Sequence, residues 1–148
     1  MGSVPSHKPF KHRHLLGIEP LEAEDIVLIL DTAVGMAEIG RRPIKKVPAL
    51  RGKTVVNFFA EPSTRTKMSF EVAEKRLSAD SLGLATSSSS VVKGETLVDT
   101  LENIQAMGPD VVVVRHPEDG ALEALDRAAS PGTHLVNAGD GARAHPTQ

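Results

Sequence analysis

Cysteine, tryptophan and tyrosine are all absent from this chain of 148 residues, and phenylalanine occurs only four times. Without cysteine there is no disulfide, no thiol nucleophile and no thiolate ligand for a metal, which fits a reducing compartment. So few aromatic rings leave almost no surface on which nucleobases can stack. The formal net charge of −2 offers no general attraction to phosphate backbones either. We therefore expect no nucleic-acid partner.

Long apolar runs are also missing. No segment approaches the roughly 18 consecutive apolar residues that a membrane-spanning helix needs, and the first residues lack the apolar core of a signal peptide. The start of the chain, Met1 to Ser6, has the spacing of a myristoylation signal, but the same residues suit an ordinary flexible tail. We expect no membrane partner and a cytoplasmic location.

Residues 1–14 are rich in basic and imidazole side chains, and we expect them to form a flexible N-terminal arm. A metal site on His12 and His14 is the alternative, but no carboxylate or further histidine is spaced to complete it. Residues 15–148 then have the size and composition of a single globular domain.

A helix is predicted after Pro20, which suits a first helical position, and before Gly40, which suits a helix end. Apolar residues recur between them at the spacing of one helix face. We expect that face to be buried, and its members are Ile26, Ile29, Leu30, Ala33, Met36 and Ala37.

From residue 54 onward, short β-type runs alternate with helical patterns. The predicted strands are Thr54–Phe59, Leu82–Thr86, Val111–Val114 and His134–Asn137, and the predicted helices centre on residues 68–77, 97–107 and 119–129. Four β-branched residues in a row at 111–114 are typical of a strand covered on both faces. The alternation predicts an α/β fold with a doubly wound, mainly parallel sheet of about four strands and helices on both faces.

Ligands of open parallel sheets bind beyond the carboxyl ends of the strands, so the loops after the four strands are the candidate site. The loop after the first strand, Ala60 to Thr66, is the most informative. Ser63 or Thr64 can cap the next helix, whose N-terminal N–H groups then face an anion, and Arg65 adds a fork of donors suited to phosphate. A plain helix cap with a surface arginine explains the same residues equally well.

Two other phosphate-binding patterns fail on context. Gly52-Lys53-Thr54 resembles the end of a Walker A loop, but it precedes a strand and the required earlier glycine is Val47. The run from Gly139 to Ala144 fits a dinucleotide fingerprint and follows a strand, but it lacks the downstream helix and acidic residue. We interpret neither as a nucleotide site.

The loops resemble those of the aspartate/ornithine carbamoyltransferases over about residues 14 to 148. Phe59-x-Glu61-x-Ser63-Thr64-Arg65-Thr66 is similar to that family's phosphate-binding signature, and His145-Pro146-Thr147-Gln148 is similar to a motif shared by both branches. Three further motifs resemble the aspartate branch in particular. They are Lys93-Gly94-Glu95-Thr96, Arg115-His116-Pro117 and Asn137-Ala138-Gly139-Asp140-Gly141.

The resemblance implies transfer of a carbamoyl group from carbamoyl phosphate to the amine of L-aspartate, for pyrimidine biosynthesis, with no metal and no organic cofactor. It implies that His145 and Thr66 polarise the carbonyl oxygen and that Gln148 contacts the carbamoyl amide. Arg115 is expected near both phosphate and carbonyl. The catalytic residues are then Arg65, Thr66, Arg115, His145 and Gln148, and carbamoyl phosphate is bound by these five together with Ser63 and Thr64.

The resemblance also implies a homotrimer, with or without regulatory or other pyrimidine-pathway subunits, in which Ser89 and Lys93 enter the site from a neighbouring subunit. The residues alone favour a flexible linker with a solvated lysine. The chain departs from the family at Val92, where some relatives carry a second basic residue, and at Lys67, where arginine is common.

The chain stops at Gln148, where the family continues into a second, aspartate-binding domain. We therefore expect residues 15–148 to be a carbamoyl-phosphate-binding domain that is inactive alone. Two alternatives stay open: the equivalent half of an ornithine carbamoyltransferase, and a non-catalytic module that assembles trimers.

Overall fold

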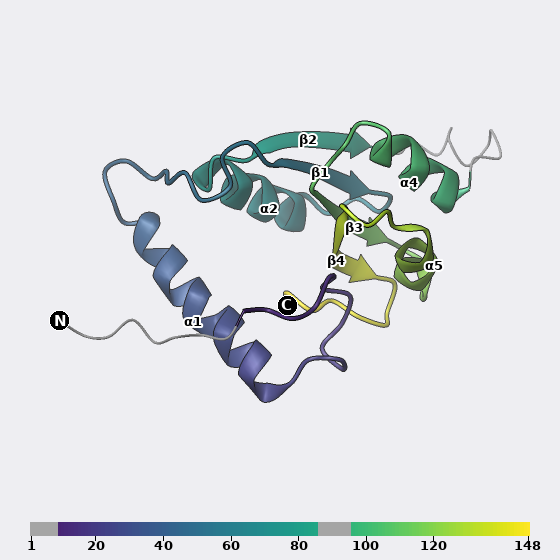
Figure 1. Ribbon diagram of the computed structural model, residues 1–148, viewed down its shortest axis with the longest axis horizontal. Coiled ribbons are helices and arrows are strands. Elements are labelled where there is room, and N and C mark those ends of the chain that lie inside the picture. The colour runs from purple at the N-terminus through teal and green to yellow at the C-terminus, as the bar shows by residue number, and fades with distance from the viewer. Residues whose placement is uncertain (1–8, 86–95) are drawn as a thin grey trace.

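The computed structural model describes residues 9–85 and 96–148. Its centre is a four-stranded sheet in the order β2-β1-β3-β4, in which every neighbouring pair is parallel (Figure 1). The strands are β1 (Thr54–Phe59), β2 (Asp80–Ala85), β3 (Val111–His116) and β4 (His134–Asp140). The helices are α1 (Ala23–Ile39), α2 (Thr64–Arg76), α4 (Leu97–Gln105) and α5 (Ala121–Ala128).

Helices cover both faces of this sheet, so the predicted α/β, doubly wound fold is confirmed. Alternate residues of a strand point to opposite faces, and the buried side chains divide accordingly. The larger core cluster joins one face to α4 and α5, and consists of Val56, Phe58, Leu101, Ile104, Val112, Val114, Ala121, Leu122, Leu125 and Leu135. The smaller cluster lies on the other face, where Phe70 of α2 packs near Val55, Phe59, Val113 and Ala138.

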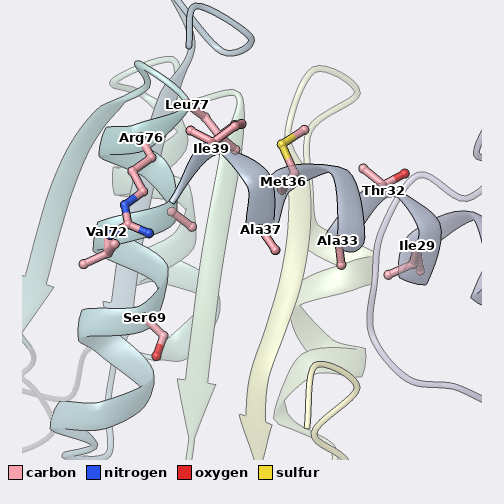
Figure 2. A pocket seen from close by; sticks show the side chains of 11 residues that line it. Ile29, Thr32, Ala33, Met36, Ala37, Ile39, Ser69, Val72, Arg76 and Leu77 are labelled. Atoms are coloured by element: carbon pink, nitrogen blue, oxygen red, sulfur yellow. The ribbon is translucent and has the colours of Figure 1, made fainter. Parts of the chain in front are cut away.

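The predicted burial of α1 is wrong. Leu30 is 59% exposed and Val34 70% exposed, and the only buried residues of the helix are Asp25 and Ile39. Figure 1 shows α1 standing away from the sheet. Ala33 and Ala37 of α1 and Ser69 and Val72 of α2 line an open apolar hollow of about 500 Å³ between the two helices. Figure 2 shows these lining side chains. The apolar spacing therefore predicted the helix correctly, but its apolar face is not buried against the rest of the domain.

The start of α1 also differs from the prediction. The helix begins at Ala23, and Pro20 precedes it in a turn closed by the bond from the Leu21 N–H to the Ile18 carbonyl, 3.0 Å long. Glu22 is the N-cap, and its N–H donates to the Asp25 carboxylate at 3.0 Å. This side-chain acceptor starts the helix, because it satisfies an N–H that has no partner within the helix.

Part of the predicted flexible arm is docked on the domain. His12 contacts Asp25 at 2.8 Å, and Arg13 donates to carbonyls at the end of α5. The imidazole of His14 accepts the Leu135 N–H at 2.9 Å, and Leu15 pairs with β4 as a parallel bridge. His14 and Leu15 thus satisfy polar groups at the edge of β4, while His12 and Arg13 contact other parts of the domain. Residues 1–8 lie outside the described part, where flexibility stays a prediction.

Among the described helices, none is both long and apolar enough to cross a bilayer.

Candidate functional site

The carboxyl ends of β1, β3 and β4 lie at one edge of the sheet, because the strands are parallel and adjacent in the order β1-β3-β4. The segment after β1 leads into α2, the segment after β3 into α5, and the segment after β4 runs to Gln148. The segment after β2 includes residues 86–95, so the predicted residues Ser89 and Lys93 lie outside the described part of the chain.

The helix start after β1 lacks the side-chain cap that the sequence predicted. Ser63 occupies the N-cap position, but its side chain makes no capping bond and instead lies 3.0 Å from the Thr66 hydroxyl. The first N–H groups of α2 have no partner within the helix, and no carboxylate lies in its first turn. This helix end therefore suits an anion, because its N–H groups and its dipole both favour negative charge.

Arg65 and Thr66 line a cavity together with residues that are about 80 positions away in the sequence. The cavity has a volume of about 330 Å³, and its wall includes His145, Thr147 and Gln148 from the far end of the chain. The fold thus brings the start of α2 and three of the last four residues to one place. Thr64 lines a neighbouring hollow of about 450 Å³ with Ser63, Glu61 and Lys67.

Arg115 at the end of β3 is held by groups on both neighbouring strands. Its Nη1 donates to the Ala138 carbonyl of β4 at 2.9 Å. Its Nε lies 3.4 Å from a carboxylate oxygen of Glu61, just after β1, but this N–H is not aligned for a hydrogen bond. The guanidinium therefore keeps a buried donor unused within the described structure, which suits a group that must also bind a ligand oxygen.

Gly139 leaves room for Arg115. Its φ of +140° lies in a region that side chains rarely adopt, and a Cβ built there would lie 2.7 Å from Nη1 of Arg115 and 3.1 Å from its Cγ. Gly139 belongs to one of the motifs of the sequence, but the motif did not predict this role. The same is true of Glu61, whose contact with Arg115 depends on two strands being neighbours.

His145 is half-buried, and its pKa lies below the ordinary value of 6.5 because burial, and then the nearby positive charge of Arg115, disfavour the imidazolium. The ring is therefore mainly neutral at pH 7. Its Nδ1 lies 3.1 Å from the Thr147 hydroxyl. When that hydroxyl donates to Nδ1, the ring carries its proton on Nε2 and can donate it to a ligand oxygen.

The described residues include no group of three or more histidine or acidic side chains arranged to hold a metal ion. His12 and His14, the alternative metal ligands, are each paired with groups of the domain itself, namely Asp25 and the Leu135 N–H.

A family model matches residues 13–148 of the chain, and it describes the carbamoyl-P binding domain of the aspartate/ornithine carbamoyltransferases. Among curated proteins, the aspartate carbamoyltransferase catalytic subunit of Desulforapulum autotrophicum is 57% identical over 139 residues, which cover 94% of this chain and 44% of that protein. The corresponding subunit of Desulfotalea psychrophila is 58% identical, over 94% of this chain and 43% of that protein.

Solved structures of similar proteins show the same fold. The catalytic subunit of M. jannaschii aspartate transcarbamoylase matches with a TM-score of 0.80 and 39% identity, over 92% of this chain and 44% of that one. The Trypanosoma cruzi aspartate transcarbamoylase, in complex with carbamoyl phosphate and aspartate, matches with a TM-score of 0.84 and 31% identity, over 98% of this chain and 44% of that one.

The chain thus spans less than half the length of these relatives. Within that span, the family match covers the three strand ends that meet at the candidate site. The chain belongs to the aspartate/ornithine carbamoyltransferase family, as its carbamoyl-P binding domain.

Proposed function

We propose that this chain is the carbamoyl-phosphate-binding half of an aspartate carbamoyltransferase of pyrimidine biosynthesis. We also propose that the enzyme is cytoplasmic, which cell fractionation tests. The observation that carries the proposal is the cavity in which Arg65 and Thr66 meet His145 and Gln148 at the carboxyl edge of the sheet. The similar T. cruzi enzyme was solved with carbamoyl phosphate and aspartate bound. The curated relatives that we compared are aspartate enzymes, which favours aspartate over ornithine as the acceptor.

The phosphate group is proposed to bind at the start of α2. Its N–H groups, the hydroxyls of Ser63, Thr64 and Thr66, and the guanidinium of Arg65 supply donors of the kind that phosphate oxygens accept. Arg65 is exposed at the cavity wall, so a ligand reaches it without any displacement of the core.

The carbamoyl group is proposed to lie toward His145 and Gln148. A neutral His145 donates from Nε2 to the carbonyl oxygen together with Thr66, and the Gln148 side chain contacts the amide. As the amine attacks the carbonyl carbon, negative charge grows on that oxygen and then on the departing phosphate. Arg115 lies near His145 and stabilises both charges, which is electrostatic catalysis without a protein nucleophile.

Aspartate is proposed to be recognised by the part of the longer relatives that this chain does not cover. We also propose that the working unit is a homotrimer in which Ser89 and Lys93 act from a neighbouring subunit. A mixture of Arg65→Ala and Lys93→Ala chains then regains carbamoyl phosphate sites that neither variant has alone. A mixture that exchanges subunits yet binds no better than its components contradicts the shared site.

Arg65→Ala is the test of the phosphate site. Loss of a charge-assisted, two-pronged contact is expected to weaken carbamoyl phosphate binding by about 2–5 kcal/mol, measured by calorimetry. Arg41→Ala is the matched control, because Arg41 follows the end of α1, its side chain is 78% exposed, and its ion pair within the described residues is with the exposed Glu38. Equal affinity of the Arg65→Ala variant and the unchanged chain rules out the phosphate assignment. Absence of any binding by the unchanged chain favours a non-catalytic module.

A further inference from the structure

Two aspartates tie the segment after β3 to the segment after β4. Asp119 lies between β3 and α5, and its Oδ1 accepts the Ala142 N–H at 2.7 Å. Asp140 ends β4, and its carboxyl lies close enough to the backbone N–H groups of Gly120 and Ala121, at the start of α5, for them to favour its charged form. Each segment therefore places a carboxylate near the backbone of the other, through the Asp119 hydrogen bond in one direction and the proximity of Asp140 to the start of α5 in the other.

Asp140 is a costly residue to place in this position. It is 3% exposed, and one of its oxygens has no hydrogen-bond partner within the described structure. Burial raises the pKa of its carboxyl, although the nearby N–H groups of Gly120 and Ala121 oppose that rise. Because a buried carboxylate destabilises a fold unless it is well paired, its presence here calls for a role other than filling space.

Backbone hydrogen bonds add to these contacts along the segment that leads to His145. The Asp140 N–H donates to the Ala144 carbonyl at 2.9 Å, and the Arg143 N–H donates to the Asp140 carbonyl at 2.9 Å, which closes a tight turn. The Gly141 N–H donates to the His116 carbonyl at 2.9 Å. The hydrogen bond from the Asp140 N–H to the Ala144 carbonyl therefore holds the residue just before His145 to the end of β4.

Gly141 shows how closely the two segments approach. A Cβ at this position would overlap with the Asp119 Oδ1 and lie 2.9 Å from the Pro117 carbonyl oxygen, and the residue has a φ of +55°. Only glycine fits this position, and the Asp119 carboxylate packs directly against the turn. Both carboxylates belong to the framework around the site and neither lines its cavity.

We propose that Asp119 and Asp140 are positioning residues, which together hold His145 at the distance from Arg65 and Thr66 that the carbamoyl group requires. This inference rests on the proposed function and deepens it. The two aspartates act through His145 and contact no ligand. A displacement of a catalytic group by about 1 Å costs on the order of 10²-fold in rate, so a rigid turn before His145 has a direct chemical purpose.

The test is the Asp119→Ala variant of the chain at its full length of 148 residues, measured in two ways. The first measurement is a proton NMR titration of the His145 ring, whose signals are assigned because they are missing in His145→Gln. The pKa of His145 is expected to rise toward 6.5, because the released turn leaves the ring less buried and farther from Arg115. Calorimetry is expected to show carbamoyl phosphate binding at least about tenfold weaker, while inorganic phosphate, held by the start of α2, changes by less than about threefold.

Two control variants separate positioning from general damage. Arg143→Ala lies on the same turn and removes the ion pair with Glu123, but it leaves both carboxylate links in place. It is expected to bind both ligands like the unchanged chain. Asp119→Asn keeps an oxygen that can accept the Ala142 N–H, and it is expected to restore both the His145 pKa and carbamoyl phosphate affinity to within about threefold.

An unchanged His145 pKa and unchanged carbamoyl phosphate affinity in folded Asp119→Ala overturn the proposal. If that variant does not fold, amide exchange of Ala142 in the unchanged chain decides: the proposal requires slow exchange, and exchange at the rate of an unstructured peptide overturns it. If no chain binds carbamoyl phosphate but the His145 pKa still shifts in Asp119→Ala, the proposed function fails while the positioning of His145 stands.

Discussion

On one face of the sheet, α4 and α5 enclose a core of apolar side chains, whereas on the other face α2 meets the sheet partly through buried polar groups and α1 stays largely exposed. The polar contact is a cluster of three residues from three elements. Asn57 of β1 donates to both carboxylate oxygens of Glu74 on α2, at 2.7 and 3.0 Å, and the Ser81 hydroxyl of β2 donates to the same carboxylate at 3.2 Å.

The difference concerns how each face obtains its stability. The face toward α4 and α5 relies on removal of apolar surface from water, which is indifferent to pH. The face toward α2 relies in part on a buried carboxylate, whose pKa is raised by burial although the bonds from Asn57 and Ser81 oppose the rise. Its stability therefore depends on protonation.

The helices α1 and α5 make the same contrast at the level of single side chains. Both have apolar residues at helical spacing, but Leu125 of α5 is 0% exposed and Leu30 of α1 is 59% exposed. Because most helix stability in proteins comes from tertiary packing, equal substitutions in these helices have unequal effects.

The largest effect is expected for Leu125→Ala. This side chain is enclosed by the apolar core, so its truncation leaves a cavity and is expected to lower the free energy of unfolding by about 2–5 kcal/mol. Urea denaturation followed by circular dichroism measures the loss. A change below about 1 kcal/mol would mean that the α5 face is no better packed than α1, and the contrast between the faces would disappear.

An intermediate effect, visible as a change in pH dependence, is expected for Glu74→Gln. The folded pKa of Glu74 is raised above 4.5, so its contribution to stability is complete below about pH 4.5 and is lost as the pH rises through the folded value. Glutamine keeps an acceptor for Asn57 and Ser81 and removes the charge, and Asn57 Oδ1, which has no partner in the described structure, can accept its N–H.

Urea midpoints measured between pH 4.5 and 7 are therefore expected to fall less steeply with rising pH in Glu74→Gln than in the unchanged chain. Glu102→Gln, which removes an exposed carboxylate of α4, is the control for net charge. Parallel curves for Glu74→Gln and the unchanged chain would show that the buried carboxylate has no influence on this face. Asp140, whose pKa is also raised, contributes equally to the pH dependence of stability in Glu74→Gln and in the unchanged chain.

Much of the sheet could be predicted from local pattern alone. The run Val111–Val114 indicated a strand covered on both faces, and it is the best buried part of β3. The rule that ligands bind at the carboxyl ends of parallel strands predicted the edge where Arg65, Arg115 and His145 lie. The individual roles of these residues came from resemblance to a family, because no local pattern distinguishes a phosphate ligand from a helix cap.

Other features depend on which strands become neighbours, and local pattern holds no information on that. The bond from Ala142 to Asp119 and the approach of Gly139 to Arg115 each join residues more than 20 positions apart. The exposure of the apolar side of α1 is a further feature that local pattern did not predict. Its spacing matches that of a buried helix, and only the three-dimensional arrangement shows the apolar side open.

The smallest effect is expected for Leu30→Ala, the same chemical change as Leu125→Ala placed on α1. Leu30 is 59% exposed, so truncation removes little buried surface, and alanine favours the helix slightly more than leucine does. The free energy of unfolding is expected to change by less than about 0.5 kcal/mol, measured by urea denaturation at low protein concentration. A loss of about 2 kcal/mol or more would show that Leu30 is buried in solution. Repeating the measurement over a range of protein concentrations then identifies the cause, because burial between copies of the chain makes the loss grow with concentration, whereas burial within one chain does not.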